Sequence, residues 1–315
     1  MSALKKTLAA VATTASLALA GHASAATPAP KEEISFVKIS PDITLRRMIV
    51  KNPRPKGTVL FLHGFPETML TWRSLSQQLA SEYEVHAFDW PGYGESSRPS
   101  IDKFSYAPRD YAQVLKAYID ASGIDKSKLV IYATDIGGLP SMLLALEQPD
   151  IARQIIVGDF APLDRPQWMS ERLRNLKAPQ TAEVIRKALN QGRDDTIENA
   201  FRRGLDPSEQ FSIQQDVKAD MLSSWDKGSM STADAFYHYY SHFTRDQQYF
   251  EANLPRLTAP VKVVWGEKDI YIDKKMGEEF AAKAGKPFAI LPKLGHYPHL
   301  QDPQKAVSEI RAAFD

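Results

Sequence analysis

A buried strand that ends in an acidic turn constrains this chain more than any other feature. Residues 129–133 form a continuous apolar and aromatic run, Asp135 follows two positions later, and the pair Gly137-Gly138 opens an apolar helical stretch. This pattern predicts a strand, a very tight turn and a helix that starts beneath the turn. Such a turn closes only around residues with almost no side chain, as at Ala133 and the glycine pair. Asp135 is then either the N-cap of the helix or a nucleophile held on a strained elbow, and the rest of the chain has to decide.

The first 25 residues have the pattern of a secretory signal peptide. Lys5 and Lys6 give a positive start, residues 8–20 are apolar and rich in alanine, and residues 23–25 read Ala-Ser-Ala, which fits the small-x-small cleavage rule. The apolar run is too short to span a bilayer of about 30 Å comfortably, so we expect cleavage rather than a retained membrane anchor. The sequence therefore predicts an exported, periplasmic protein that is not attached to a membrane after cleavage.

Charge and composition exclude several other classes of partner and chemistry. The chain has 39 basic and 38 acidic residues and no basic stripe, which argues against a nucleic-acid partner. It has no cysteine, so disulfides, thiolate chemistry and cysteine zinc sites are excluded. The pairs His238/His242 and His296/His299 lack the H-E-x-x-H context of a metal enzyme, and no glycine-rich dinucleotide loop follows an early strand. We expect no cofactor, and the oligomeric state stays open.

Strand and helix patterns alternate up to about residue 160 and resume after residue 255. Two alternating segments and six apolar runs predict strands, at residues 33–39, 44–50, 58–62, 83–88, 129–133, 151–157, 261–266 and 287–291. Helical patterns lie between or after them, at residues 69–81, 106–122, 274–284 and 303–314. This alternation predicts an α/β fold with a doubly wound, mostly parallel sheet.

The segment 161–255 breaks this alternation. It contains no convincing buried strand, and its helical patterns fall at residues 180–189, 196–203, 213–225 and 232–243. A helical insertion between two strands of one sheet is typical of a lid or cap. We therefore predict that residues 26–160 and 256–315 form the core and that residues 161–255 form a helical cap.

A carboxylate nucleophile needs a base to activate water and an acid to orient that base. Candidates for both follow predicted strands. In this architecture the functional site lies at the carboxyl ends of the strands. His296 follows the last strand and is the candidate base, with His299 as its rival. Asp269, in the loop after residues 261–266, is the candidate orienting acid, and Glu267 and Asp159 are the alternatives.

The oxyanion formed during such chemistry needs backbone donors near the nucleophile. The N–H groups of Phe65 and Ile136 lie in loops after adjacent predicted strands and are the candidates. His63-Gly64 predicts the tight turn that aims the Phe65 amide inward. The bond between Phe65 and Pro66 is a plausible cis peptide, because cis is affordable only before proline.

The set of motifs resembles the α/β-hydrolase fold, with the order nucleophile, acid, histidine and a cap inserted before the acid. Residues 133–138 resemble the Asp-nucleophile branch, the epoxide hydrolases and haloalkane dehalogenases, and residues 63–67 with Trp72-Arg73 resemble the epoxide-hydrolase form of the oxyanion segment. Residues 89–96 and 295–303 also match, so the resemblance covers about residues 34–315 and is weakest in the cap. It implies that Asp135 attacks a carbon to form an alkyl ester, which water activated by His296 then hydrolyses.

The leaving group separates the two chemistries. Dehalogenases of this family tend to carry Asn at the position of Phe65 and Trp at that of Ile136, and fluoroacetate-type dehalogenases carry a basic residue at the latter. Epoxide hydrolases carry a ring-opening tyrosine on the cap helix. The register of residues 232–243 favours Tyr239, with Tyr237 or His238 as alternatives, although aromatic side chains on a helix also serve packing.

The cap departs from the epoxide-hydrolase pattern in one respect. No tyrosine occurs between Asp159 and Arg203, where a first cap tyrosine would be expected, so a second donor would have to be His238 or Trp168. We predict an exported hydrolase that opens a small apolar epoxide to a diol. A haloalkane or haloacid dehalogenase with the same ester mechanism is the alternative, and a non-catalytic binding protein on the same fold is a remote one.

Overall fold

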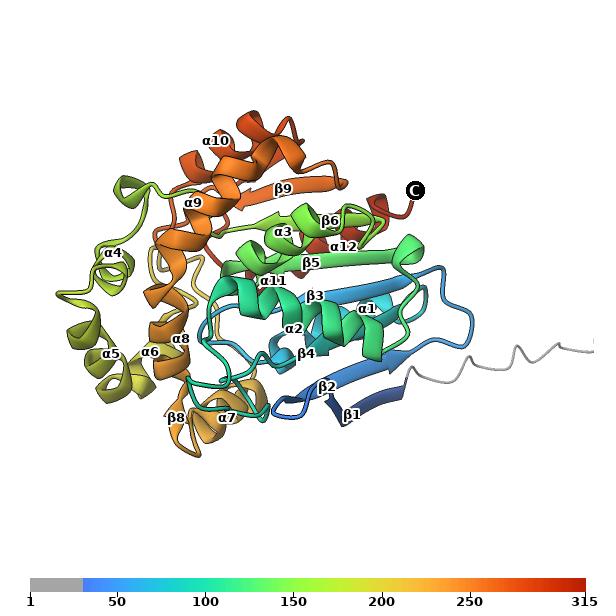
Figure 1. Ribbon diagram of the computed structural model, residues 1–315. Coiled ribbons are helices and arrows are strands. Elements are labelled where there is room, and N and C mark those ends of the chain that lie inside the picture. Colours follow the sequence, from blue (N-terminus) through green and yellow to red (C-terminus); the bar gives the residue numbers. More distant parts are fainter. Residues whose placement is uncertain (1–30) are drawn as a thin grey trace, which may run out of the picture.

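An eight-stranded sheet forms the centre of the molecule in the computed structural model, which describes residues 31–315. The predicted signal peptide of residues 1–25 lies outside the described residues. The strand order is β1-β2-β4-β3-β5-β6-β9-β10 (Figure 1). β2 pairs antiparallel with both β1 and β4, and all other pairings in this sheet are parallel. The strands are β1 (Lys31–Lys38), β2 (Thr44–Lys51), β3 (Thr58–Leu62), β4 (Glu84–Phe88), β5 (Leu129–Thr134), β6 (Gln154–Gly158), β9 (Val261–Gly266) and β10 (Phe288–Leu291). The predicted doubly wound, mostly parallel sheet is confirmed.

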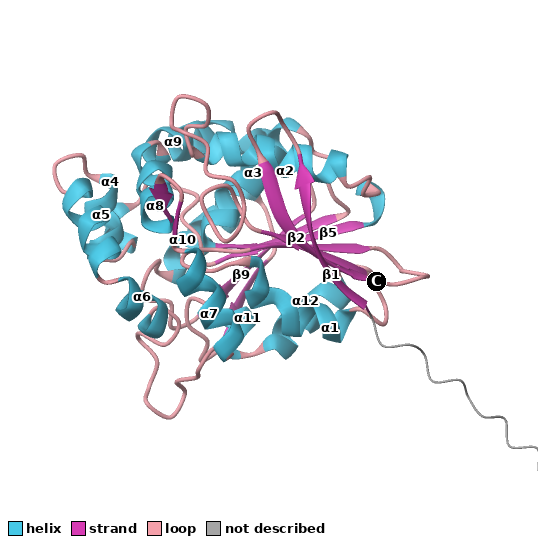
Figure 2. Ribbon diagram, turned by 90° about the horizontal axis from the view of Figure 1, so that it is seen from below, coloured by secondary structure: helices cyan, strands magenta, loops and turns pink. Residues whose placement is uncertain are grey.

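Helices cover both faces of this sheet, which is why its central strands are apolar throughout. α2 (Pro108–Ala121), α3 (Gly138–Glu147) and α9 (Phe243–Asn253) lie on one face. α1 (Arg73–Leu79), α11 (Pro298–Gln301) and α12 (Pro303–Ala312) lie on the other (Figure 2). Strands buried on two sides read as continuous hydrophobic runs, and all six residues of β5 are buried.

The segment between β6 and β9 is helical, and most of it lies beyond the carboxyl ends of the parallel strands (Figure 1). Its elements are α4 (Glu171–Lys177), α5 (Ala182–Gln191), α6 (Arg193–Asn199), α7 (Gln215–Ser224), the short hairpin β7 (Asp226–Lys227) and β8 (Met230–Ser231), and α8 (Thr232–Ser241). Ser231 and Asp234 form a capping box that starts α8. α9 lies within the predicted cap range but packs on α2 and α3 of the core.

Several element boundaries differ from the predicted ones for local reasons. The predicted helix at residues 69–81 starts as a 3₁₀ turn, Met69–Trp72, before α1. The strand predicted from residue 151 starts at Gln154, because the Ile151 amide is taken by a turn onto the Gln148 carbonyl. The sequence pattern missed α4 and α9, which carry many polar residues.

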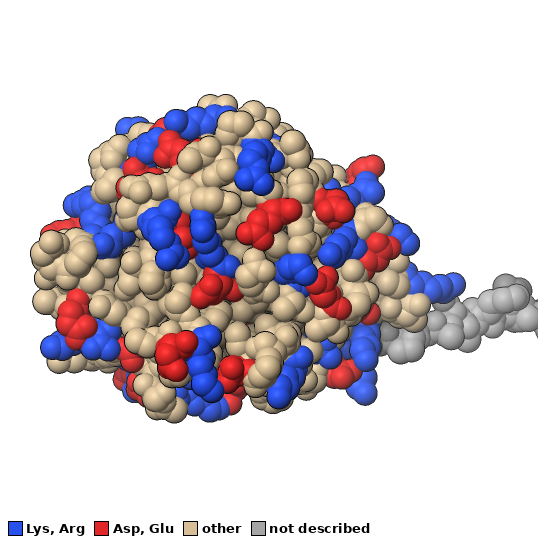
Figure 3. Space-filling model, in the orientation of Figure 1, with Lys and Arg blue, Asp and Glu red and all other residues tan. Residues whose placement is uncertain are grey.

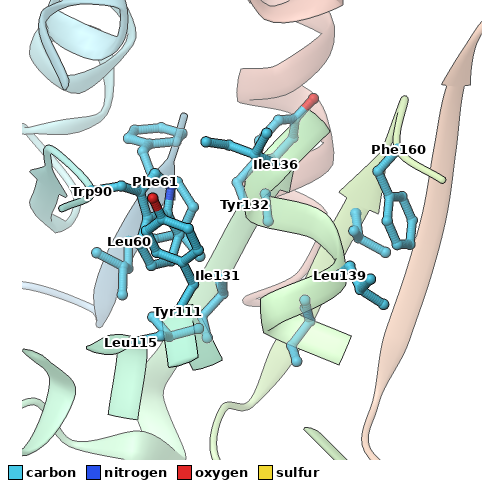
Figure 4. Close-up of a cluster of buried hydrophobic side chains, with 14 of the residues drawn as sticks. Leu60, Phe61, Trp90, Tyr111, Leu115, Ile131, Tyr132, Ile136, Leu139 and Phe160 are labelled. Carbon is cyan, nitrogen blue, oxygen red and sulfur yellow. The ribbon is translucent and has the colours of Figure 1, made fainter. Parts of the chain in front are cut away.

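A dense aromatic and aliphatic cluster supports the end of β5 (Figure 4). Tyr132 packs edge-on against Phe61 of β3, with ring centroids 6.1 Å apart. Leu139 of α3 and Phe160, which follows β6, face each other on the other side of the strand (Figure 4). Close packing on both sides leaves the turn after β5 little freedom to move.

Basic and acidic side chains are interspersed on the face of the molecule shown in Figure 3, so this face is neither uniformly positive nor uniformly negative. No helix within residues 31–315 is long and apolar enough to cross a membrane.

Candidate active site

The turn after β5 places Asp135 in a left-handed conformation, with φ of +48°. Non-glycine residues rarely adopt this conformation, and it persists only where the surroundings enforce it. The surroundings are tight: a Cβ on Gly64 would lie 2.5 Å from the Asp135 Cβ, and one on Gly138 would lie 2.4 Å from the Phe160 ring. The small residues that the sequence places at this turn are therefore required by close approach to β3 and to the loop after β6.

The Asp135 carboxylate contacts groups from two other loops. The Phe65 amide donates a hydrogen bond to Oδ1 at 2.9 Å, and His296 Nε2 lies 3.2 Å from Oδ2. His296 Nδ1 lies 2.8 Å from Asp269 Oδ2. The structure thus brings together four residues that the sequence placed at the ends of different strands.

Asp269 is held in turn by its own loop. Its Oδ1 accepts hydrogen bonds from the amides of Tyr271 at 2.8 Å and Ile272 at 3.1 Å. Oδ2 is left to contact His296 Nδ1, and this contact fixes the orientation of the imidazole ring. Glu267, the alternative acid, instead accepts from the Lys293 amide on an exposed stretch of the chain.

His296 is buried between two carboxylates. Burial alone lowers the pKa of this histidine, but Asp269 and Asp135 outweigh burial and hold the pKa well above its ordinary value. The resting imidazole is therefore protonated, and both of its N–H groups donate. Its charge depends on Asp135 staying ionised.

The rival histidine, His299, belongs to a separate buried pair. Its Nε2 lies 2.7 Å from Glu67 Oε1, and the other oxygen of Glu67 accepts from the Gly64 amide at 2.8 Å. Burial raises the pKa of Glu67, but His299 more than offsets this and lowers the pKa below its ordinary value. His299 therefore supports the turn that carries Phe65 and does not contact Asp135.

The turn at His63-Gly64 has the predicted form. His63 Nδ1–H donates to the Gly64 carbonyl at 2.8 Å and Nε2 accepts from the Trp90 amide at 3.2 Å, an arrangement that fits a neutral ring. Burial keeps the pKa of His63 below its ordinary value. The predicted cis bond between Phe65 and Pro66 is confirmed, and the Tyr297 hydroxyl donates to the Phe65 carbonyl at 2.7 Å. The Ile136 amide makes no hydrogen bond to Asp135 within residues 31–315.

A second buried acid, Asp159, lies beside this arrangement. It is fully buried with φ of +51°, its Oδ1 accepts from the Gly266 amide at 2.8 Å, and its Oδ2 has no partner within residues 31–315. Burial, reinforced by the neighbouring Asp269 carboxylate, raises the pKa of Asp159 well above its ordinary value. The raised pKa lets Asp159 keep its proton to a higher pH than an ordinary aspartate, beside the Asp269 carboxylate.

Asp159, Asp269 and His296 are also the one group in the described chain whose ligand atoms are close enough to share a metal ion, within 4.8 Å of one another. His296 and Asp269 already hold each other through a hydrogen bond, and the raised pKa of Asp159 disfavours the charged form that would bind a metal ion. The donor set therefore fits an acid–histidine chain better than a metal centre.

The cap tyrosines differ in the hydrogen bonds that their hydroxyls make. The Tyr239 hydroxyl donates to the Ile136 carbonyl at 3.2 Å, which occupies its only proton. The hydroxyl of Tyr240 makes no hydrogen bond within residues 31–315, and Asp135 is the charged group that acts on it. Burial and then the Asp135 charge raise the pKa of Tyr240 well above its ordinary value, so this hydroxyl keeps its proton. The Tyr240 hydroxyl is therefore a protonated group on which the Asp135 charge acts.

The two remaining cap candidates lie elsewhere. The Tyr237 ring sits beneath the Arg186 guanidinium, 5.4 Å from ring centroid to Cζ. His238 lies beside Tyr106, with ring centroids 6.1 Å apart, and is half-buried. Neither is among the residues that line the pocket at Asp135.

That pocket is formed jointly by the core and the cap. Its open volume is about 40 Å³, so it suits a compact molecule. Its core residues are Phe65, Asp135, Tyr271, His296 and Tyr297. The cap adds apolar side chains, among them Leu173, Leu189 and Phe236, and two guanidinium groups, Arg172 and Arg203. A pocket of this kind, apolar with a few convergent polar groups, is the default candidate for a substrate site.

The fold and this site define an α/β hydrolase with an inserted cap and an aspartate at its elbow. The chain belongs to the alpha/beta hydrolase family, whose model matches residues 59–310. It is an enzyme of the hydrolase class related to epoxide hydrolases and dehalogenases, which act on small molecules. The resemblance seen in the sequence motifs is confirmed.

Three known proteins illustrate this relationship. Epoxide hydrolase 4 of Mus musculus is 27% identical over 263 residues, which cover 77% of this chain and 68% of that protein. Fluoroacetate dehalogenase of a Burkholderia species is 34% identical over 106 residues, 33% of this chain and 34% of that protein. The crystal structure of the haloalkane dehalogenase DbeA from Bradyrhizobium elkani has a TM-score of 0.68 at 20% identity, covering 90% of this chain and all of that one.

The sequence patterns did not point to Tyr240, on which the Asp135 charge acts, or to the pocket residues Arg172 and Arg203. Tyr240 is adjacent to the predicted Tyr239, so a shift of one residue, about 100° around a helix, separated the two choices. Arg172 and Arg203 follow no strand and belong to no motif, so the sequence carried no signal for them.

Proposed function

We propose that this enzyme opens small epoxides to diols through a covalent ester on Asp135. The contact chain from Asp269 through His296 to Asp135, with the Phe65 amide on the same carboxylate, is the observation that carries the proposal. Oδ1 is held by the Phe65 amide, so Oδ2 is the oxygen that attacks a ring carbon. The carbon–oxygen bond of the ring breaks as the new ester bond forms.

The leaving oxygen takes a proton from Tyr240. Ester formation removes the charge of Asp135 and with it one of the two anions that raise the pKa of His296. His296 then releases its proton, which restores the Tyr240 hydroxyl through solvent. The neutral imidazole is thereby created at the step that needs a base.

Hydrolysis returns the enzyme to its starting state. His296 takes a proton from water, and the oxygen of that water attacks the ester carbonyl of Asp135. The Phe65 amide donates to Oδ1 as negative charge develops there. Collapse releases the diol and leaves Asp135 ionised beside protonated His296, so protons and charges balance over the cycle.

A dehalogenase reaction on the same ester is the second candidate. The similarity of one third of the chain to a fluoroacetate dehalogenase favours it. Against it, the positions that follow the elbow and the oxyanion turn are Ile136 and Phe65, which offer no side-chain donor to a halide. We also propose export of the enzyme, which the leader sequence supports.

Mass spectrometry of the intact His296→Gln variant tests these candidates. The variant still forms the ester but cannot activate water, so it should gain the full mass of an epoxide substrate. The double variant Asp135→Ala/His296→Gln is the control and should gain nothing. Mass gain from haloacids but never from epoxides would replace the epoxide reaction with the dehalogenase one. No adduct with either class would overturn both.

A further inference from the structure

Two guanidinium groups of the cap line the pocket that contains Asp135. Arg172 belongs to α4 and Arg203 follows α6, so the two come from separate elements that meet at one opening. The other cap residues of the pocket are apolar or small. A purely apolar substrate gives no reason for two cations at this place.

The two arginines differ in their existing partners. Arg203 pairs with Asp195, which also accepts a hydrogen bond from the Asn199 side chain at 2.6 Å. Arg172 makes no ion pair or hydrogen bond with any residue in the described part of the chain, 31–315. Asp195 thus pairs directly with Arg203 and acts on Arg172 only through its charge, so the N–H groups of Arg172 have no protein acceptor within residues 31–315.

Both guanidiniums act on the catalytic end of the pocket as well as on its rim. The Tyr271 ring lies 5.0 Å from the His296 ring, and its hydroxyl donates to the Ala200 carbonyl at 3.0 Å. Burial raises the pKa of Tyr271, while the positive charges of His296, Arg203 and Arg172 oppose that rise. The charges of the two arginines therefore act on Tyr271, which lies beside His296.

We infer that the substrate carries a carboxylate, which Arg172 and Arg203 bind while the reactive carbon meets Asp135. The inference rests on the proposed function of this site. A carboxylate is planar and matches the two parallel N–H groups of a guanidinium. Asp135 repels an anionic substrate, and Arg172, which makes no ion pair within residues 31–315, offsets that repulsion at the far end of a compact molecule.

Paired substrates test the inference directly. Oxirane-2-carboxylate and 3,4-epoxybutanoate would each be compared with their uncharged carboxamides, which have nearly the same shape. We expect kcat/KM at least about tenfold higher for the acids. Arg172→Gln should lower kcat/KM for the acids by about 10- to 100-fold, chiefly through KM, and leave the amides within about twofold. Arg203→Gln should act in the same direction but less, because Asp195 already shares that charge.

Matched variants separate the pocket from the general charge of the cap. Arg174, on the same helix as Arg172, donates to the Met169 carbonyl, and Arg202 precedes Arg203 and pairs with Glu198. Neither lines the pocket. Arg174→Gln and Arg202→Gln should leave the preference for the acids unchanged, and Arg172→Lys should restore part of it. Equal turnover of acids and amides, or equal losses in all four Arg→Gln variants, would overturn the inference while the epoxide reaction stands.

A binding measurement keeps the inference testable without turnover. Cyclopropanecarboxylate has the shape of the epoxy acid but no reactive oxygen, and its carboxamide is the neutral partner. Calorimetry should show the acid binding at least about tenfold tighter than the amide, and this difference should disappear in Arg172→Gln. If epoxides form no ester yet this difference is found, the reaction is wrong and the carboxylate site stands. If the acid binds no better than the amide, the carboxylate site is wrong.

Discussion

The core holds its side of the pocket rigidly, whereas the cap leaves polar groups on its side free. Asp135, His296 and Asp269 are joined by contacts of 2.8–3.2 Å, and backbone amides fix both ends of this chain. On the cap side, the Tyr240 hydroxyl and the Arg172 guanidinium make no hydrogen bond within residues 31–315. We interpret the core as the part that defines the bond-making chemistry and the cap as the part that chooses the substrate. Substitutions in the two parts should therefore change different kinetic constants.

The largest loss is expected at the elbow. Asp135→Ala removes the atom that forms the ester, and we expect turnover of any epoxide to fall by roughly 10⁴-fold or more. The rate of diol formation, monitored by chromatography, measures this loss. Circular dichroism checks that the variant is folded. Activity above about 1% of wild type would contradict the role of Asp135 as nucleophile.

The two buried acids beside His296 give a matched comparison within the core. Asp269→Asn places an amide where His296 needs an ionised partner, and kcat should fall by roughly 10³-fold. Asp159→Asn imitates a neutral acid, because its NH₂ group can donate toward Asp269 while its oxygen still accepts from the Gly266 amide. We expect kcat within about threefold of wild type. Steady-state kinetics on one epoxide would compare the two, and equal losses would show that Asp159 is ionised.

Two adjacent tyrosines give the corresponding comparison in the cap. Tyr240→Phe removes the proposed proton donor, so ring opening should slow by roughly 10²-fold. Tyr239→Phe removes only the hydrogen bond to the Ile136 carbonyl, and we expect a change below about fivefold. Single-turnover formation of the ester measures this step apart from hydrolysis. The reverse order of effects would restore Tyr239, the residue that the sequence favours, as the donor.

These comparisons also show how far the sequence could predict the site. Asp135, His296 and Asp269 follow strands with strong hydrophobic patterns, and parallel strands bring their carboxyl ends to one edge of the sheet. Their spacing therefore already implied that they meet. Whether His296 or His299 faces Asp135 was less certain, because both lie in one loop, and the buried pair of His299 with Glu67 resolves it.

The cap was harder to predict because packing, rather than periodicity, orients its side chains. The aromatic run of α8 is buried on most of its circumference, so hydrophobicity alone does not say which tyrosine hydroxyl, that of Tyr239 or that of Tyr240, stays free of a hydrogen bond. α4 is only seven residues long and exposes most of its charged side chains, so the pattern gave no helix there and no role for Arg172. Positions of this kind depend on contacts between distant segments, which a local pattern does not contain.

The smallest expected effect is a pH dependence that separates the two halves of the reaction. In the resting enzyme, burial opposes the charge of His296, but Asp269 and Asp135 keep its pKa well above the ordinary value. In the ester, Asp135 is neutral, so the pKa of His296 falls and the base becomes available. Hydrolysis should then slow by about tenfold per pH unit below this lowered pKa, while ester formation, which does not use His296 as a base, changes little.

Quenched-flow measurement of the ester fraction between pH 5 and pH 8 checks this expectation. The ester should accumulate at the acidic end in wild type, because formation outpaces hydrolysis there. In Tyr240→Phe the hydrolysis rate should keep the same pH profile, since the charge that raises the pKa of His296 in the ester comes from Asp269 and not from Tyr240. A profile that moves with the cap variant would mean that the cap takes part in the hydrolytic step. An unchanged profile would assign hydrolysis to the core alone and confine the cap to ring opening and substrate choice.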